Sequence, residues 1–235
     1  MGVAYGSSTI YQATKGIVQD GLVLNLDAGV KQSYDGGTTW RDLAGGNNGT
    51  LTNGPVFDKQ KGGTIRFDGT DDFIQANVDT SVVTGDGSIS IWLIWTTETF
   101  GIFNIKSGFG GGNYTNGQYW GIQNRFTTGT YLQFHSGQGY GSNINLSLTT
   151  GNWINVCVTY NGSGGSGKVY ANGSFISNAS WTAFATPDGD IRFGYGGYQT
   201  SDYSGNHGII NLYNRQLTAA EVSRNFNVTR HRFGI

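Results

Sequence analysis

Two clusters of aromatic and amide residues have side chains of the kind that bind sugars. The first cluster is Asn113, Tyr114, Asn116, Tyr119 and Trp120, and the second is Tyr195, Tyr198, Tyr203, Asn206 and His207. Exposed rings stack on sugar faces, while amide groups hydrogen-bond to sugar hydroxyls. Tyr and Trp rings also pack against sheets and fill subunit interfaces. The clusters therefore predict a carbohydrate site or a subunit interface, and we favour the interface.

A short acidic turn is the candidate metal site. Asp68, Asp71 and Asp72 lie within five residues of one another, and carboxylate oxygens of this kind are the ligands that Ca²⁺ prefers. Alternatively, these carboxylates accept hydrogen bonds from the backbone of their own turn, as Asp commonly does. We favour the second interpretation, and we expect no other cofactor.

Side chains that would support catalysis are scarce. Glycoside hydrolysis requires two carboxyl groups that flank the scissile bond. The chain has only two glutamates, Glu98 and Glu221, and the second belongs to a helix cap. The histidines are isolated, and neither a Gly-x-Ser-x-Gly elbow nor a phosphate-binding Gly-Lys-Ser/Thr sequence occurs. We therefore predict that the protein is not an enzyme.

These side chains must be positioned by β-strands. In residues 153–160 the alternation puts Ile154, Val156, Val158 and Tyr160 on one face of a strand. Asn172-Gly173 supplies the positive-φ pair of a tight hairpin turn. Residues 88–96 are apolar on both faces, which predicts a central strand. Further strands are expected at 22–28, 65–68, 73–76, 100–106, 119–124, 130–135, 143–148, 191–195 and 208–213.

One helix is expected near the C-terminus. Thr218 and Glu221 have the spacing of a capping box, so the helix should begin at Thr218 and run to about Phe226. The rest of the pattern predicts an all-β fold, a jelly-roll sandwich of two packed antiparallel sheets.

Three stretches resemble the laminin G-like, concanavalin A-like jelly-roll family. They are the Trp153 strand that ends in Val158-Thr159-Tyr160 with its Asn172-Gly173 hairpin, the Phe67 to Asp72 turn, and the stretch from Asn211 to Val222. The resemblance implies a jelly roll in which the strands at 65–68 and 73–76 form a pair. Relatives that cut glucans carry a Glu-x-Asp-x-(x)-Glu strand motif, which this chain lacks. Since the fold serves lectins, adhesion modules, glycosidases and structural domains, it does not define one function.

A narrower resemblance is to laminin G-like modules of tailed-bacteriophage virion proteins. The residues that carry it are Gly21 to Ala28, Thr38 to Leu43, Asn47 to Pro55 and Leu212 to Val222. It implies a virion structural protein, a capsid decoration or tail-associated jelly roll that is made in the host cytoplasm. Its partners would be other virion proteins and further copies of itself in a homo-oligomer. The alternative is a lectin-like adhesion module that attaches to host or environmental polysaccharide, including cell-surface glycans.

Composition restricts the remaining partners. Charged residues make up 12% of the 235 residues and the net charge is −1, so we expect binding to neither nucleic acid nor membrane. The sequence shows no apolar stretch that would span a bilayer and no signal-peptide layout. We expect a jelly-roll domain over residues 21–235. Residues 1–20 would form an arm that anchors the domain to another subunit or to a capsid, or a frayed tail.

Overall fold

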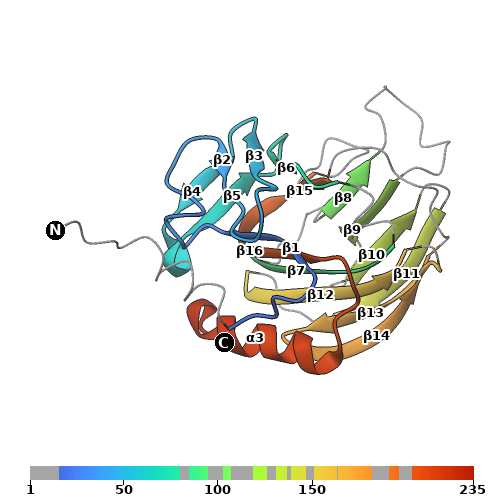
Figure 1. Ribbon diagram of the computed structural model, residues 1–235. Helices are drawn as coiled ribbons and strands as arrows, with labels where there is room; N and C mark the ends of the chain where they lie inside the picture. The colour runs from blue at the N-terminus through green and yellow to red at the C-terminus, as the bar shows by residue number, and fades with distance from the viewer. Residues whose placement is uncertain are drawn as a thin grey trace.

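The computed structural model describes residues 16–79, 85–94, 103–106, 119–125, 131–136, 139–146, 151–162, 164–181, 191–195 and 203–235. Within these ranges the strands form two antiparallel sheets of eight strands each, stacked in two layers (Figure 1). The all-β, two-sheet prediction is confirmed. No helix in the described ranges is both long enough and apolar enough to cross a membrane.

Sheet A is built around the longest strand, β16. Its order is β14 (Ser174–Ser180), β13 (Ser166–Ala171), β12 (Trp153–Asn161), β7 (Asp86–Ile94), β16 (Ser204–Tyr213), β5 (Thr64–Asp68) and β4 (Val56–Asp58), and β1 (Leu22–Asp27) also pairs with β16. The first half of β16 pairs with β5 and its second half with β1. The hairpin turn between β13 and β14 has positive φ at Asn172 and Gly173, as predicted.

Sheet B carries the remaining strands. Its order is β11 (Gly139–Asn145), β10 (Tyr131–Ser136), β9 (Tyr119–Arg125), β8 (Phe103–Lys106), β15 (Ile191–Phe193), β6 (Phe73–Ala76), β3 (Gly49–Thr52) and β2 (Thr39–Trp40). Its inward side chains meet those of sheet A in one apolar core. That core includes Ile91 and Val158 from sheet A, and Ile74 and Phe193 from sheet B.

Strand β7 is buried on both faces, as its sequence predicted. Ile89, Ile91 and Leu93 face the core between the sheets. Trp92 faces the other way, into a second cluster that includes Phe226 and Phe233 of the C-terminal helix. The helix thus supplies the cover that an apolar outer face requires.

The C-terminal helix, α3 (Ala219–Phe233), lies across the outer face of sheet A (Figure 1). Its predicted start is confirmed, because Thr218 is the N-cap and forms a capping box with Glu221. The predicted end was wrong, because the helix continues beyond Phe226 to Phe233. Phe233 is the last buried residue on the apolar face of the helix. Gly234, with φ 79°, adopts the left-handed conformation and ends the helix as its C-cap.

The strands that flank the acidic turn do not form the expected pair. β5 pairs with β16 and β4 in sheet A, whereas β6 pairs with β15 and β3 in sheet B. The turn between them therefore carries the chain from one sheet to the other. Strand spacing alone does not distinguish such a crossing from a hairpin.

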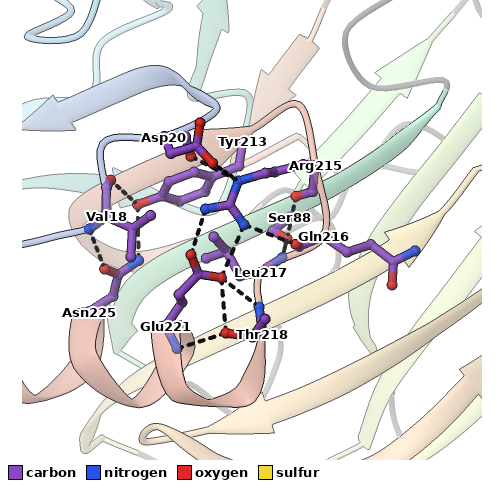
Figure 2. Close-up of polar contacts among 10 residues, drawn as sticks. All are labelled: Val18, Asp20, Ser88, Tyr213, Arg215, Gln216, Leu217, Thr218, Glu221 and Asn225. Carbon is purple, nitrogen blue, oxygen red and sulfur yellow. Dashed lines mark hydrogen bonds and ion pairs between the residues drawn. The ribbon is translucent and has the colours of Figure 1, made fainter.

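Residues 16–20 of the predicted arm lie against sheet A and α3 (Figure 2). Ile17 and Val18 are buried. The Val18 N–H donates to Asn225 Oδ1 at 2.8 Å, and the Tyr213 hydroxyl donates to the Val18 carbonyl at 3.1 Å. Residues 1–15 lie outside the described residues, so the boundary at residue 20 stays a prediction.

Candidate functional site

The outward face of sheet B carries a row of polar side chains across four neighbouring strands. Thr39 pairs with Thr50, Thr50 with Gln75, and Gln75 with Arg192. Because strand side chains alternate between faces, residues paired in this way share one face. The flanking residues of each strand, among them Trp40, Ile74 and Phe193, are buried in the core. We call Thr39, Thr50, Gln75 and Arg192 the polar row.

A pocket opens along the polar row. Its volume is about 390 Å³, and it is lined by Thr39, Asn48, Thr50, Gln75, Ala76, Asn77 and Val78. The hydroxyl and amide groups in this lining both donate and accept hydrogen bonds. The volume lies within the usual range for small-molecule sites, and the lining is suited to a ligand rich in hydroxyl groups.

Three side chains at the Arg192 end of the row form a compact group, which we call the aromatic corner. The Arg192 guanidinium lies 4.2 Å from the centre of the Phe73 ring and 5.1 Å from that of Tyr195. The two rings meet edge to face with centroids 5.6 Å apart. Arg192 also donates a hydrogen bond of 3.3 Å to Gln75 Oε1. These contacts hold the guanidinium in place by cation–π attraction, next to the polar row.

A loop held together by one carboxylate positions Asn48 at the pocket. Asp42 accepts hydrogen bonds from five backbone N–H groups, those of Asn25, Ala44, Gly45, Gly46 and Asn47, at 2.7 to 3.1 Å. The Asp42 N–H in turn donates to Asn48 Oδ1 at 3.0 Å, and the Asn48 carbonyl accepts from the Asn77 N–H. Asp42 is therefore a positioning residue for this wall of the pocket.

The backbone pairing continues from Arg192 onto further strands. Arg192 pairs with Asn104, Asn104 with Gly121, and Gly121 with His135. This line of paired backbone positions crosses seven strands of sheet B, which at about 4.8 Å per strand is on the order of 30 Å.

Of the first predicted sugar cluster, Tyr119 and Trp120 are consecutive residues of β9, where Tyr119 pairs with Lys106 and Trp120 pairs with Ile105. Their role as sugar contacts stays a prediction. Asn113, Tyr114 and Asn116 lie outside the described residues, as does Tyr198 of the second cluster.

Of the second predicted cluster, Tyr195 lies at the aromatic corner, half-buried beside Arg192. Tyr203 and Asn206 are buried, so the prediction that they are exposed sugar contacts was wrong. The Tyr203 hydroxyl lies 2.6 Å from the Ile94 carbonyl oxygen, and burial raises its pKa. The Asn206 amide donates to Thr64 Oγ1 at 2.9 Å and to Asp58 Oδ2 at 3.1 Å.

The acidic turn borders the aromatic corner through Phe73. One carboxylate oxygen each from Asp68, Asp71 and Asp72 lie within 4.8 Å of one another. Asp68 Oδ1 accepts from the Thr70 N–H at 2.8 Å, and Asp72 Oδ2 accepts from the Asp68 N–H at 2.9 Å. Burial, together with the two neighbouring carboxylates, raises the pKa of Asp72. The predicted backbone caps are thus present at two of the three residues, and these carboxylates also have the chemistry of a Ca²⁺ site.

The acidic and basic groups near the start of α3 form a network of hydrogen bonds and ion pairs (Figure 2). Arg215 binds both carboxylate oxygens of Glu221, at 2.6 and 3.0 Å, and forms an ion pair with Asp20 at 2.8 Å. The Arg215 hydrogen bonds lower the pKa of Glu221 to about 2. Glu221 is therefore ionised and fully used by the helix cap. The other glutamate, Glu98, lies outside the described residues.

Gln75 and Arg192 were not singled out from the sequence. Each is the one polar residue in the middle of a short apolar strand, in Phe-Ile-Gln-Ala and Ile-Arg-Phe. That alternation is a visible signal for an outward-facing polar side chain. However, residues 39, 50, 75 and 192 are brought together only by strand order, which the sequence pattern does not encode.

The fold and the family model agree on the class of protein. The model described as Concanavalin A-like lectin/glucanases superfamily matches residues 68–223. The chain therefore belongs to this superfamily, as its resemblance to laminin G-like jelly rolls indicated. No curated protein sequence matched the chain.

Solved structures similar to this chain include carbohydrate-related domains. Trypanosoma rangeli sialidase in complex with sialic acid matches with TM-score 0.64 and 16% identity, over 88% of this chain and 32% of the sialidase. Domain 4 of AbnA, a GH43 extracellular arabinanase from Geobacillus stearothermophilus in complex with arabinotriose, matches with TM-score 0.64 and 17% identity, over 88% and 98%. The receptor binding domain of botulinum neurotoxin C/D mosaic serotype matches with TM-score 0.66 and 14% identity, over 89% and 52%.

These likenesses concern the fold. The chain spans about a third of the sialidase and half of the neurotoxin domain, but nearly all of the arabinanase domain. The arabinanase match is to one domain of that enzyme, its domain 4.

Proposed function

We propose that this protein is a non-catalytic carbohydrate-binding domain, and that its site is the pocket along the polar row together with the aromatic corner. The observation that carries the proposal is the position of the pocket. It lies on the outward face of sheet B, whereas α3 covers the outward face of sheet A. Amides and hydroxyls line the pocket, and a half-buried aromatic ring lies at the end of the row. This is the combination that sugar recognition uses.

The lining supports binding rather than hydrolysis. Glycoside hydrolysis requires two carboxyl groups on opposite sides of the bond that is cut. The described residues that line the pocket include no carboxylate. The Glu221 carboxylate belongs to the helix cap on the other side of the molecule.

A glycan array tests the proposal directly. We expect the wild-type protein to bind a defined set of glycans. Gln75→Ala and Tyr195→Ala should each weaken that binding about fivefold, since one hydrogen bond or ring contact contributes on the order of 1 kcal/mol. Gln216→Ala and Phe175→Ala are the matched controls, because both side chains are exposed and lie away from the pocket. Equal binding by all four variants would contradict the proposed site.

Our second proposal is that the protein is a component of a phage virion. It is supported by the sequence resemblance to phage modules. Residues 16–20 are fixed against α3, on the face of the molecule opposite to the pocket. A domain held from that side would present the pocket outward, as a capsid decoration or tail-associated lectin would. Mass spectrometry and immunogold labelling of purified phage particles test this role. Absence of the protein from the particles would contradict it.

Calcium at the acidic turn is a subsidiary proposal from the sequence. It is supported by three carboxylates within reach of one ion and by the raised pKa of Asp72. An ion would relieve the repulsion among these groups. Addition of CaCl₂ should then raise the melting temperature of the wild-type protein more than that of Asp71→Asn. MgCl₂ at equal ionic strength is the control.

A further inference from the structure

His207 is buried in the core directly behind the aromatic corner. Its ring is fully buried, and neither ring nitrogen has a hydrogen-bond partner among the residues that the structure describes. It packs against two aromatic rings, with centroid distances of 4.7 Å to Phe67 and 4.5 Å to Tyr203. A buried imidazole without partners is uncommon and costly, because both of its polar atoms have lost water.

The described surroundings of His207 keep it uncharged. Its strand partners are Ile65 on β5 and Leu93 on β7. The titratable group that faces it is the Tyr203 hydroxyl, which is neutral and held by carbonyl oxygens. Strand alternation puts the nearby charged groups on the outer face of sheet A. These groups are Asp58, Arg66 and Asp68.

Burial accordingly lowers the pKa of His207 from its ordinary 6.5 to about 3. In any state in which β16 opens and water reaches the ring, the imidazole recovers its ordinary basicity. The folded-state pKa is depressed, so stability from the neutral ring is present above pH 6.5 and is lost as the pH falls towards 3.

A short chain of contacts joins His207 to the aromatic corner. The Tyr203 N–H donates to the Gly194 carbonyl at 2.9 Å. Gly194 also packs so closely on Phe67 that a Cβ there would lie 2.6 Å from the ring, and its φ is +84°. Gly194 immediately precedes Tyr195 and is two residues from Arg192. The two aromatic residues that enclose His207 therefore also fix the backbone of the corner.

We propose that His207 makes carbohydrate binding sensitive to acid. When β16 opens from β5, the imidazole is exposed to water, and its protonation stabilises the open state. The Tyr203 and Phe67 contacts with Gly194 are then lost, and the aromatic corner is no longer held in position. This inference rests on the proposed function for its effect on binding. The opening itself is independent of any ligand.

The expected size of the effect follows from linkage. Below pH 6.5 the open state gains about tenfold in population for each pH unit, which is about 30-fold at pH 5. The corner should therefore open more often at pH 5 while the rest of the domain stays folded.

Two measurements at pH 7.5 and pH 5.0 test the proposal. The first is hydrogen exchange of peptides that cover residues 191–195 and 203–213, corrected for the intrinsic exchange rate at each pH. The second is the glycan array at the same two pH values. Wild type is compared with His207→Leu and His207→Gln, which differ in shape and polarity but do not titrate. His231→Gln, which removes an exposed histidine of α3, is the matched control.

We expect acid to increase exchange in both peptides and to weaken binding in wild type and His231→Gln, but not in the His207 variants. Equal acid sensitivity in all four proteins would overturn the proposal. So would an acid response that persists in both His207 variants. Absence of glycan binding at both pH values would overturn the proposed function, whereas the exchange measurement would still decide the role of His207.

Discussion

The side chain of Glu221 stabilises the fold through several contacts at once. Its carboxylate binds Arg215 through two hydrogen bonds and completes the capping box with Thr218. We expect Glu221→Ala to lower the free energy of unfolding by about 1–2 kcal/mol at pH 7, from the lost cap and the lost ion pair. Glu221→Gln should cost about half as much, because the amide still accepts the cap hydrogen bonds.

The free energy that Glu221 contributes to folding decreases at acidic pH. The folded-state pKa of Glu221 is lowered from 4.5 to about 2. Its stabilisation is therefore complete above pH 4.5 and is lost as the pH falls towards 2. Urea titrations of wild type and both variants at pH 7 and pH 3 measure it, with Gln216→Ala as the control in the same turn. A difference that stays constant with pH would contradict the assignment.

At the residue scale, the sequence predicted the types of side chain better than their positions. Tyr195 lies at the aromatic corner, whereas Tyr203 is part of the core and Asn206 is buried against Thr64 and Asp58. All three lie close together in the sequence, and the sequence pattern alone does not show which of them are buried. Gln75 and Arg192 were missed for the same reason, since they become neighbours through pairing of β6 with β15.

Among the elements, α3 has the clearest energetic role. Phe233 stacks on Trp92 with ring centroids 4.1 Å apart and is 2% exposed. We expect Phe233→Ala to lower the free energy of unfolding by about 3–5 kcal/mol, as other buried aromatic truncations do. Ile235→Ala, two residues further on and exposed, should change it by less than about 0.5 kcal/mol. Urea unfolding followed by Trp fluorescence measures both, and equal losses would show that the helix end contributes little.

Residues 16–20 act as an element of the domain even though they form no strand. Removal of residues 1–15 leaves their contacts with Tyr213, Arg224 and Asn225 intact. Removal of residues 1–20 exposes the surface that Ile17 and Val18 cover, which should cost about 3–5 kcal/mol. We therefore expect the melting temperature to fall by about 10 °C for the second truncation, and to change little for the first. Differential scanning calorimetry compares them, and equal melting temperatures would contradict this role.

The elements were predicted where local chemistry specifies them. The capping box located the start of α3, the Asn172-Gly173 pair located a turn, and apolar residues on both faces identified β7 as central. The end of α3 and the sheet crossing between β5 and β6 were not predicted. Both depend on tertiary packing, because Phe233 is held by Trp92 and each strand is held by partners distant in sequence.

For the whole molecule, the predicted homo-oligomer is the property most open to test. Size-exclusion chromatography with light scattering on the full chain should give a mass of at least twice 25.2 kDa if the prediction holds. The chain lacking residues 1–15 should show whether that segment contributes to assembly. A monomer in both cases would favour an independent binding module. An oligomer would multiply the pockets on one particle and raise avidity without any new contact.

The contact between the start and the end of the described chain has a practical consequence. Gly16 packs against Val228, and its carbonyl accepts a hydrogen bond from Arg224 at 2.9 Å. From Val228 to Ile235 the helix advances only about 10 Å. Gly16 and Ile235, the two ends of the described chain, therefore lie on the same side of the molecule, beside α3. A domain with this geometry can be inserted as a cassette into a loop of another protein, or circularly permuted with a short linker, and still present its polar face to solvent.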